Sequence, residues 1–130
     1  VLIDDYAHHP EELTRSILSV KELYAGRRIT GIFQPHLYTR TRDFADDFAR
    51  SLSLLDELIL IDIYPAREEP IPGVTSEMIL ERVTIADKRC CTKAELPDII
   101  AAGTFDVVLI LGAGDIDRLV EPIRQILAQR

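Results

Sequence analysis

The chain has 130 residues, of which 47% are hydrophobic and 28% charged, and its formal net charge at pH 7 is -7. This length predicts one domain over residues 1–130, large enough to enclose a hydrophobic core. The acidic balance argues against a nucleic-acid partner, which normally requires a basic surface. The sequence contains no run of 18 apolar residues, so we expect no membrane partner either. Cys90 and Cys91 are neighbours, which argues against a disulfide framework and favours a cytoplasmic protein.

The first half of the chain alternates apolar runs with helical patterns. The run at 1–4 predicts a strand, and apolar residues spaced four, three and four apart predict a helix over 11–25, with proline in its first turn. A second strand is predicted at 28–34. The helix that follows it is expected to be capped by Thr41 or Asp43.

The second half continues the alternation. A third strand is predicted at 57–64, a short helix at 75–82, and a fourth strand at either 83–86 or 89–92. The remaining predicted elements are a helix at 94–102, a buried strand at 105–114, and a helix at 116–128 that Pro122 kinks or divides. Strands that are apolar on both faces and alternate with helices predict an α/β fold. We expect a Rossmann-like, doubly wound, mostly parallel sheet of five to six strands with helices on both faces.

Polar clusters follow four of the predicted strands. They are DDYAHHP at 4–10, QPHLYTRTRD at 34–43, YPAREEPIPG at 64–73 and GAGD at 112–115. In open α/β sheets, ligands bind beyond the carboxyl ends of the strands, which is where these clusters fall. The turns expected at the opposite edge look ordinary. This one-sided distribution predicts a binding site at the carboxyl edge of the sheet.

The first cluster holds several candidate ligand contacts. Either Asp4 or Asp5 could cap the following helix, and Asp5 is also well placed to accept hydrogen bonds from ligand hydroxyl groups. Tyr6 either packs against the protein or presents its ring to a base. His8 and His9 suggest metal, but adjacent residues rarely bind one ion together and no cysteine or third histidine lies nearby in sequence, so we expect no metal site.

The second cluster carries His36, Arg40 and Arg42 just before a helix. Arginine matches carboxylate and phosphate groups, and helix N-termini favour anions, so an anionic ligand is one interpretation. The alternative is that the arginines pair with the aspartates that follow them. The GAGDID segment lacks the third glycine of a dinucleotide fingerprint, and no P-loop motif is present. The residues alone therefore indicate an anion- or nucleotide-contacting domain without a complete catalytic set.

The segments DDYAHHP, FQPHLYTRTRDFADDF, DIYPAREEPIPG and LGAGDI together resemble the C-terminal domain of the Mur ligases, over nearly the whole chain. The second and third segments are the most specific, and they are similar to the branch that adds alanine. The resemblance implies that residues 1–130 are the last of three domains. A UDP-sugar domain and a central P-loop ATPase domain would precede them.

In these ligases ATP phosphorylates the muramoyl carboxylate, an amine attacks the acyl phosphate, and an amide forms with loss of phosphate. The resemblance therefore implies ATP and Mg²⁺, bound mainly by the central domain, and UDP-N-acetylmuramate and L-alanine as substrates for peptidoglycan precursor synthesis. It implies nucleotide contacts at Asp5, Tyr6 and His8, and substrate contacts at His36 and Arg40. No catalytic residue and no metal ligand is expected in this chain, which should be inactive alone.

Two positions depart from the family pattern: Leu37 replaces an arginine of relatives, and Arg67 replaces a frequent glycine. Two other interpretations stay open. One is a free-standing flavodoxin-like binding or regulatory module. The other is a different ligase of the same superfamily, such as the one that recycles murein tripeptide, whose second loop should lack the RTRD run.

Overall fold

The computed structural model describes residues 1–129 and contains one five-stranded sheet in the order β1-β5-β2-β3-β4. Every neighbouring pair of strands is parallel. The strands are β1 (Leu2–Asp5), β2 (Ile29–Phe33), β3 (Glu57–Leu60), β4 (Asp87–Cys90) and β5 (Val107–Leu111). The predicted α/β fold with a parallel sheet is confirmed.

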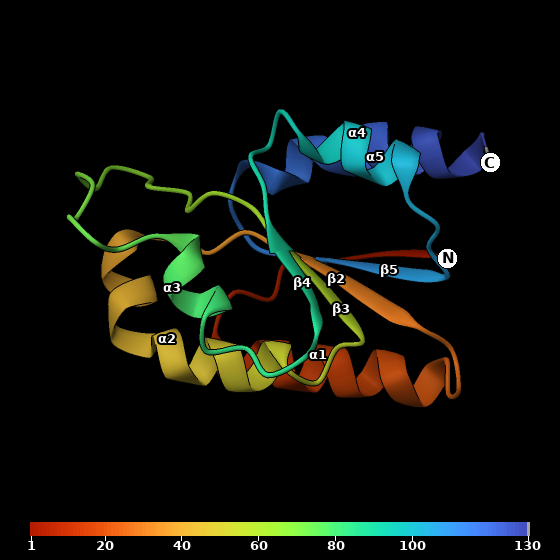
Figure 1. Cartoon of the computed structure of the whole chain (residues 1–130), viewed down its shortest axis with the longest axis horizontal. Helices are drawn as coiled ribbons and strands as arrows, with labels where there is room; N and C mark the ends of the chain where they lie inside the picture. The colour runs from red at the N-terminus through yellow and green to blue at the C-terminus, as the bar shows by residue number, and fades with distance from the viewer. Residues whose placement is uncertain (130) are drawn as a thin grey trace.

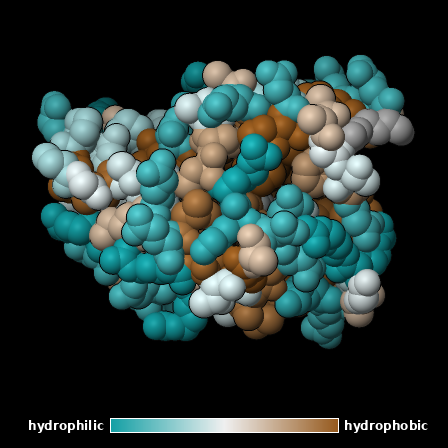
Figure 2. Space-filling view, in the orientation of Figure 1, coloured by the Kyte–Doolittle hydropathy of each residue, from teal (hydrophilic) through white to brown (hydrophobic). Residues whose placement is uncertain are grey.

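Helices cover both faces of the sheet, as Figure 1 shows. One layer is α1 (Pro10–Leu23), α2 (Tyr38–Leu52) and α3 (Ser76–Leu80); the other is α4 (Leu96–Ala102), the 3₁₀ turn η1 (Asp115–Leu119) and α5 (Val120–Ala128). In Figure 2 the hydrophobic side chains visible on this face gather in the middle, between mostly polar outer surfaces. Over the described part of the chain, every helix is too short or too polar to cross a membrane.

The burial of strand β5 on both faces of the sheet explains why its sequence is apolar without interruption. Successive side chains of a strand point to opposite faces of the sheet. Val107, Leu109 and Leu111 therefore enter the core under α1 and α2, and Val108 and Ile110 enter the core under α4 and α5. All five are at most 1% exposed.

Helix α1 begins at Pro10, as predicted, but its cap differs from the expectation. The N-cap residue is His9, whose backbone N–H donates to Glu12 Oε1 at 3.0 Å. The prediction that Asp4 or Asp5 caps this helix is wrong, because the N-cap is His9 and the Glu12 carboxylate, one turn inside the helix, accepts the N–H groups of His8 and His9.

Helix α2 begins at Tyr38, earlier than the predicted caps Thr41 and Asp43. The buried Thr41 hydroxyl instead donates to the Leu37 carbonyl at 2.8 Å, inside the first turn. Leu37 is the N-cap residue, with φ of 71°. The earlier start places Arg40 in the first turn of the helix.

The fourth and fifth strands differ in their bounds from the predicted ones, whereas the last helix is divided as predicted. Strand β4 excludes residues 83–86 and shares only two residues with 89–92. It is an edge strand rich in charge, so it lacks a hydrophobic pattern. Strand β5 ends at Leu111, before the predicted end at residue 114. The next residue, Gly112, takes φ of 131°. Pro122 lies in the first turn of α5, after the separate turn η1, so the predicted division of this helix is confirmed.

We expect Leu109→Ala to lower the free energy of unfolding by about 2–5 kcal/mol, because it opens a cavity in the fully buried middle of β5. The matched control is Leu18→Ala on the outer face of α1, where the side chain is 49% exposed and the change should stay within about 0.5 kcal/mol. Urea unfolding of both variants measures the difference. Equal midpoints would contradict the assignment of β5 to the core.

Candidate functional site

Backbone pairing between β2 and β3 continues past the ends of both strands. The N–H of Tyr64 donates to the Pro35 carbonyl at 2.8 Å, and the N–H of Leu37 donates to the Tyr64 carbonyl at 2.8 Å. His36 and Tyr64 therefore face each other as an isolated parallel bridge. The loops after β2 and β3 are held together at the carboxyl edge of the sheet.

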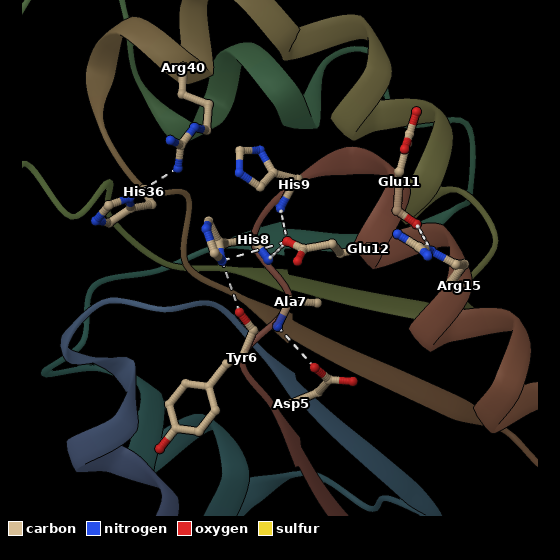
Figure 3. Close-up of polar contacts among 10 residues, drawn as sticks. All are labelled: Asp5, Tyr6, Ala7, His8, His9, Glu11, Glu12, Arg15, His36 and Arg40. Carbon is tan, nitrogen blue, oxygen red and sulfur yellow. Dashed lines mark hydrogen bonds and ion pairs between the residues drawn. The ribbon is translucent and has the colours of Figure 1, made fainter.

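Three of the predicted site residues meet at this edge: His8, His36 and Arg40 (Figure 3). The ring centroids of His8 and His36 are 5.9 Å apart, and those of His8 and His9 are 4.6 Å apart. Arg40 Nη1 lies 3.1 Å from His36 Nδ1. The loop after β1, the loop after β2 and the start of α2 thus supply one cluster, which we call the histidine–arginine cluster: His8, His9, His36 and Arg40.

The contact with Arg40 fixes the protonation of His36. A guanidinium group only donates hydrogen bonds, so Nδ1 of His36 accepts and the imidazole is neutral with its proton on Nε2. Burial lowers the pKa of His36, and the charges of Arg40 and His8 lower it further, against the opposing effect of Glu68. The pair combines a fixed cation with an N–H donor, which is an arrangement suited to an anion.

The side chains of Asp5 and Tyr6 point away from His36 and Arg40 (Figure 3). Asp5 accepts the N–H of Ala7 at 2.9 Å on one oxygen and the hydroxyl of Ser16 at 2.6 Å on the other. Tyr6 donates its hydroxyl to Asp117 at 3.1 Å, and the residue is 59% exposed. Asp5 therefore shapes the loop that carries His8, while Tyr6 offers an exposed ring beside it.

A second polar network fixes the turn after β5, and the sequence did not reveal it. The amide of Gln34, which is 1% exposed, donates to Asp115 Oδ1 at 2.6 Å and accepts the N–H of Ile116 at 2.9 Å. Lys93 pairs with the other oxygen of Asp115. Burial raises the pKa of the Asp115 carboxyl, but the bonds from Lys93 and Gln34 outweigh it and leave that pKa lowered.

The histidine–arginine cluster is poorly suited to bind a metal ion. Within residues 1–129, the group His8, His9 and Glu12 has potential ligand atoms within 4.8 Å of one another. His36, although distant in sequence, lies close to His8 in space, so a third histidine does adjoin this group. However, Glu12 Oε1 already accepts the N–H groups of His8 and His9, and Arg40 adds a positive charge to the same region. These contacts favour an anion over a cation.

A groove of about 1020 Å³ adjoins the cluster between α1 and α2. His9 and Glu12 line one end of it, while His36 and Arg40 lie outside. Phe44, 43% exposed, lines it where α2 departs from helical geometry. The groove extends the accessible surface from the cluster along the two helices.

The hydrogen bonds that the Glu12 carboxylate accepts predict that the stability of the fold depends on pH. Hydrogen bonds from the N–H groups of His9 and His8 lower the pKa of Glu12 in the folded chain. This contribution is therefore present above the unfolded pKa, about 4.3, and is lost as pH falls through the lower folded value. We expect Glu12→Gln to reduce the urea midpoint at pH 7, and the two midpoints to converge below about pH 4.3.

Glu11→Gln is the matched control, because Glu11 is the neighbouring acidic residue of the same turn and its side chain makes no hydrogen bond among those found in residues 1–129. Glu11→Gln should lower the urea midpoint at pH 7 by less than Glu12→Gln does. Parallel curves for Glu12→Gln and the original chain at all pH values would refute the capping role.

Comparison with known proteins finds relatives over nearly the whole chain. The family described as "Mur ligase, glutamate ligase domain" matches residues 1–114. The chain is 73% identical over its full length to the UDP-N-acetylmuramate–L-alanine ligase of Parabacteroides distasonis, and 62% identical over 128 residues to that of Porphyromonas gingivalis. It spans 28% of the length of each of these relatives.

Solved structures show the same fold. The UDP-N-acetylmuramate–alanine ligase of Thermotoga maritima superposes with a TM-score of 0.69 at 28% identity, over 98% of this chain and 26% of that one. A murein peptide ligase of Psychrobacter arcticus gives a TM-score of 0.78 at 21% identity, over 99% of this chain and 28% of that one, which is a likeness of fold. The sequence match and the arrangement of the sheet lead to one conclusion: the chain belongs to the Mur ligase family.

Proposed function

We propose that this chain is the C-terminal domain of a three-domain, ATP-dependent ligase that joins L-alanine to UDP-N-acetylmuramate in the cytoplasm. The observation that carries the proposal is the histidine–arginine cluster at the carboxyl edge, in a chain 73% identical to part of an enzyme named for that reaction. The murein peptide ligase is the less supported alternative, because its likeness to this chain is limited to the fold.

In the proposed reaction, ATP phosphorylates the muramoyl carboxylate, the alanine amine attacks the acyl phosphate, and phosphate leaves as the amide forms. Arg40 and the Nε2–H of His36 would contact an anionic group, either the alanine carboxylate or the phosphate. His8 is 5.9 Å from His36 between ring centroids and would contact the same ligands or the nucleotide. Asp5 would act mainly by holding the loop of His8, and Tyr6 would present its exposed ring to the nucleotide.

This chain's residues suit the anions of the reaction but not its Mg²⁺. The carboxylates nearest the cluster, Glu12 and Glu68, already accept backbone N–H groups, of His9 and Thr39 respectively. Asp115 is paired with Lys93. We therefore assign the metal, and the main contacts with the ATP phosphates, to the domains that precede this one in the full-length ligase.

The role of Arg40 is tested in the full-length ligase by phosphate release with UDP-N-acetylmuramate and L-alanine. We expect Arg40→Lys to lower kcat/KM for alanine about 10²-fold, the scale of losing one donor to a developing charge, because lysine keeps the charge but loses the planar fork. Arg42→Lys is the matched control, since Arg42 is exposed and pairs with Asp43. Equal kinetics for the two variants would remove Arg40 from the site.

The division of labour between domains gives a second test. We expect the 130-residue chain alone to release no phosphate from ATP above the buffer rate, because its sequence has no P-loop. The full-length ligase, assayed beside it with both substrates, should turn over. Phosphate release that co-purifies with the isolated chain and disappears in Arg40→Ala would show that the chain is catalytic by itself.

A further inference from the structure

The ring of Tyr64 lies against the His36 imidazole. Their ring centroids are 5.5 Å apart and their planes differ by 18°, so the two rings are stacked. Offset stacking of this kind stabilises the relative orientation of two aromatic rings beyond the area that it buries. The imidazole is thus held on its face by Tyr64 and on its Nδ1 edge by Arg40.

Tyr64 in turn rests on the backbone of Gly114. A Cβ atom at position 114 would lie 2.7 Å from Tyr64 Cγ and 2.8 Å from Tyr64 Cβ. It would also lie 2.5 Å from Gln34 Oε1, the oxygen that accepts the Ile116 N–H. Only glycine lets the tyrosine and the buried amide approach this turn so closely. The turn after β5 therefore fixes the position of the Tyr64 side chain.

The backbone and the ring of Tyr64 have separable roles. The N–H and carbonyl of Tyr64 hold the loop after β2 through Pro35 and Leu37, whatever its side chain is. The ring alone touches the imidazole of His36. A change of side chain should therefore alter the setting of the imidazole while the two loops stay paired.

We propose that Tyr64 is a positioning residue whose ring, seated on Gly114, sets the plane of the His36 imidazole and the direction of its Nε2–H toward the substrate. The assignment rests on the proposed function of His36. Tyr64 itself touches neither the reacting atoms nor the nucleotide in this mechanism; it acts through His36.

The first test measures His36 itself by ¹⁵N NMR of its ring in the 130-residue chain, whose two cores are closed by its own residues. We expect Tyr64→Leu to expose the imidazole and raise the His36 pKa back toward its ordinary value. We also expect it to mix the two tautomers, because a ring free to turn no longer keeps Nδ1 on Arg40. Tyr64→Phe keeps the stack and should match the original chain. The groups facing His36 are Arg40 from α2, His8 and His9 from the first loop, and Glu68 from the third; all are unchanged in these variants.

The second test measures kinetics in the full-length ligase. We expect Tyr64→Leu to lower kcat/KM for alanine about tenfold, because a misdirected donor weakens a bond made to the reacting groups, while Tyr64→Phe restores it. The KM for ATP should change less than about twofold, an effect below 0.5 kcal/mol. Gly114→Ala should reproduce the Tyr64→Leu effect by displacing the ring, and it provides a second variant if Tyr64→Leu folds poorly. Tyr24→Leu, at the opposite edge of the sheet, controls for loss of stability.

The outcomes separate the two hypotheses. If His36→Asn leaves kcat/KM unchanged, the proposed function of His36 fails, and the NMR result alone decides whether Tyr64 orients the ring. If His36→Asn is impaired but Tyr64→Leu keeps kcat/KM within twofold of the original, the positioning role is overturned. An equal loss in Tyr24→Leu and Tyr64→Leu would also overturn it, since that pattern reflects stability.

Discussion

The carboxyl edge depends on the parallel backbone pairing that β2 and β3 extend into their loops. The bonds that join Tyr64 to Pro35 and to Leu37 tie the backbones of the second and third loops together, and the bond from the Thr39 N–H to Glu68 adds a side-chain link between the start of α2 and the third loop. With them, His36 and Tyr64 occupy a sheet-like register beyond the sheet. Functional side chains that are carried on a strand extension are set more rigidly than those on free loops. The sheet therefore reaches directly into the histidine–arginine cluster.

Backbone strain is concentrated in the same two loops. Within residues 1–129, Leu37 and Ala66 are the non-glycine residues with positive φ, at 71° and 54°. Leu37 is held there by its N–H bond to Tyr64 and by the Thr41 N–H and hydroxyl, which both donate to its carbonyl. Such conformations cost about 1–3 kcal/mol and persist where surrounding bonds over-determine them. Here the strained residue turns the chain from strand to helix in one step, which brings Arg40 back onto His36.

The limits of prediction from sequence follow from the same physics. Strand β5 was predictable because its residues are apolar on both faces, and α1 because Leu13, Ile17 and Val20 repeat with helical spacing. The edge that bears the site followed from the rule for parallel sheets. The start of α2 was not predictable, because nothing in a leucine signals positive φ.

Side-chain partners were the least predictable part of the site. Asp5 looked like a free acceptor for a ligand, yet its bonds to Ala7 and Ser16 depend on how the loop folds back on α1. Gln34 and Tyr64 looked like strand ends, and their roles arise from contacts with the turn after β5, about 80 and 50 residues away in sequence. A tyrosine whose Cβ faces a glycine is recognisable only once the strand order is known.

Under the proposed function, the electrostatics of the histidine–arginine cluster explain why the site needs a neighbouring domain. A neutral His36 leaves the positive charge on Arg40, in a chain whose net charge is -7. Arg40 and His36 are only partly buried, so water screens any anion that they bind. Covering the edge with another domain would exclude that water and strengthen the same bonds several-fold. A cluster that is ordered in advance but exposed thus gains its full strength only on closure, which couples binding at this edge to assembly of the complete site.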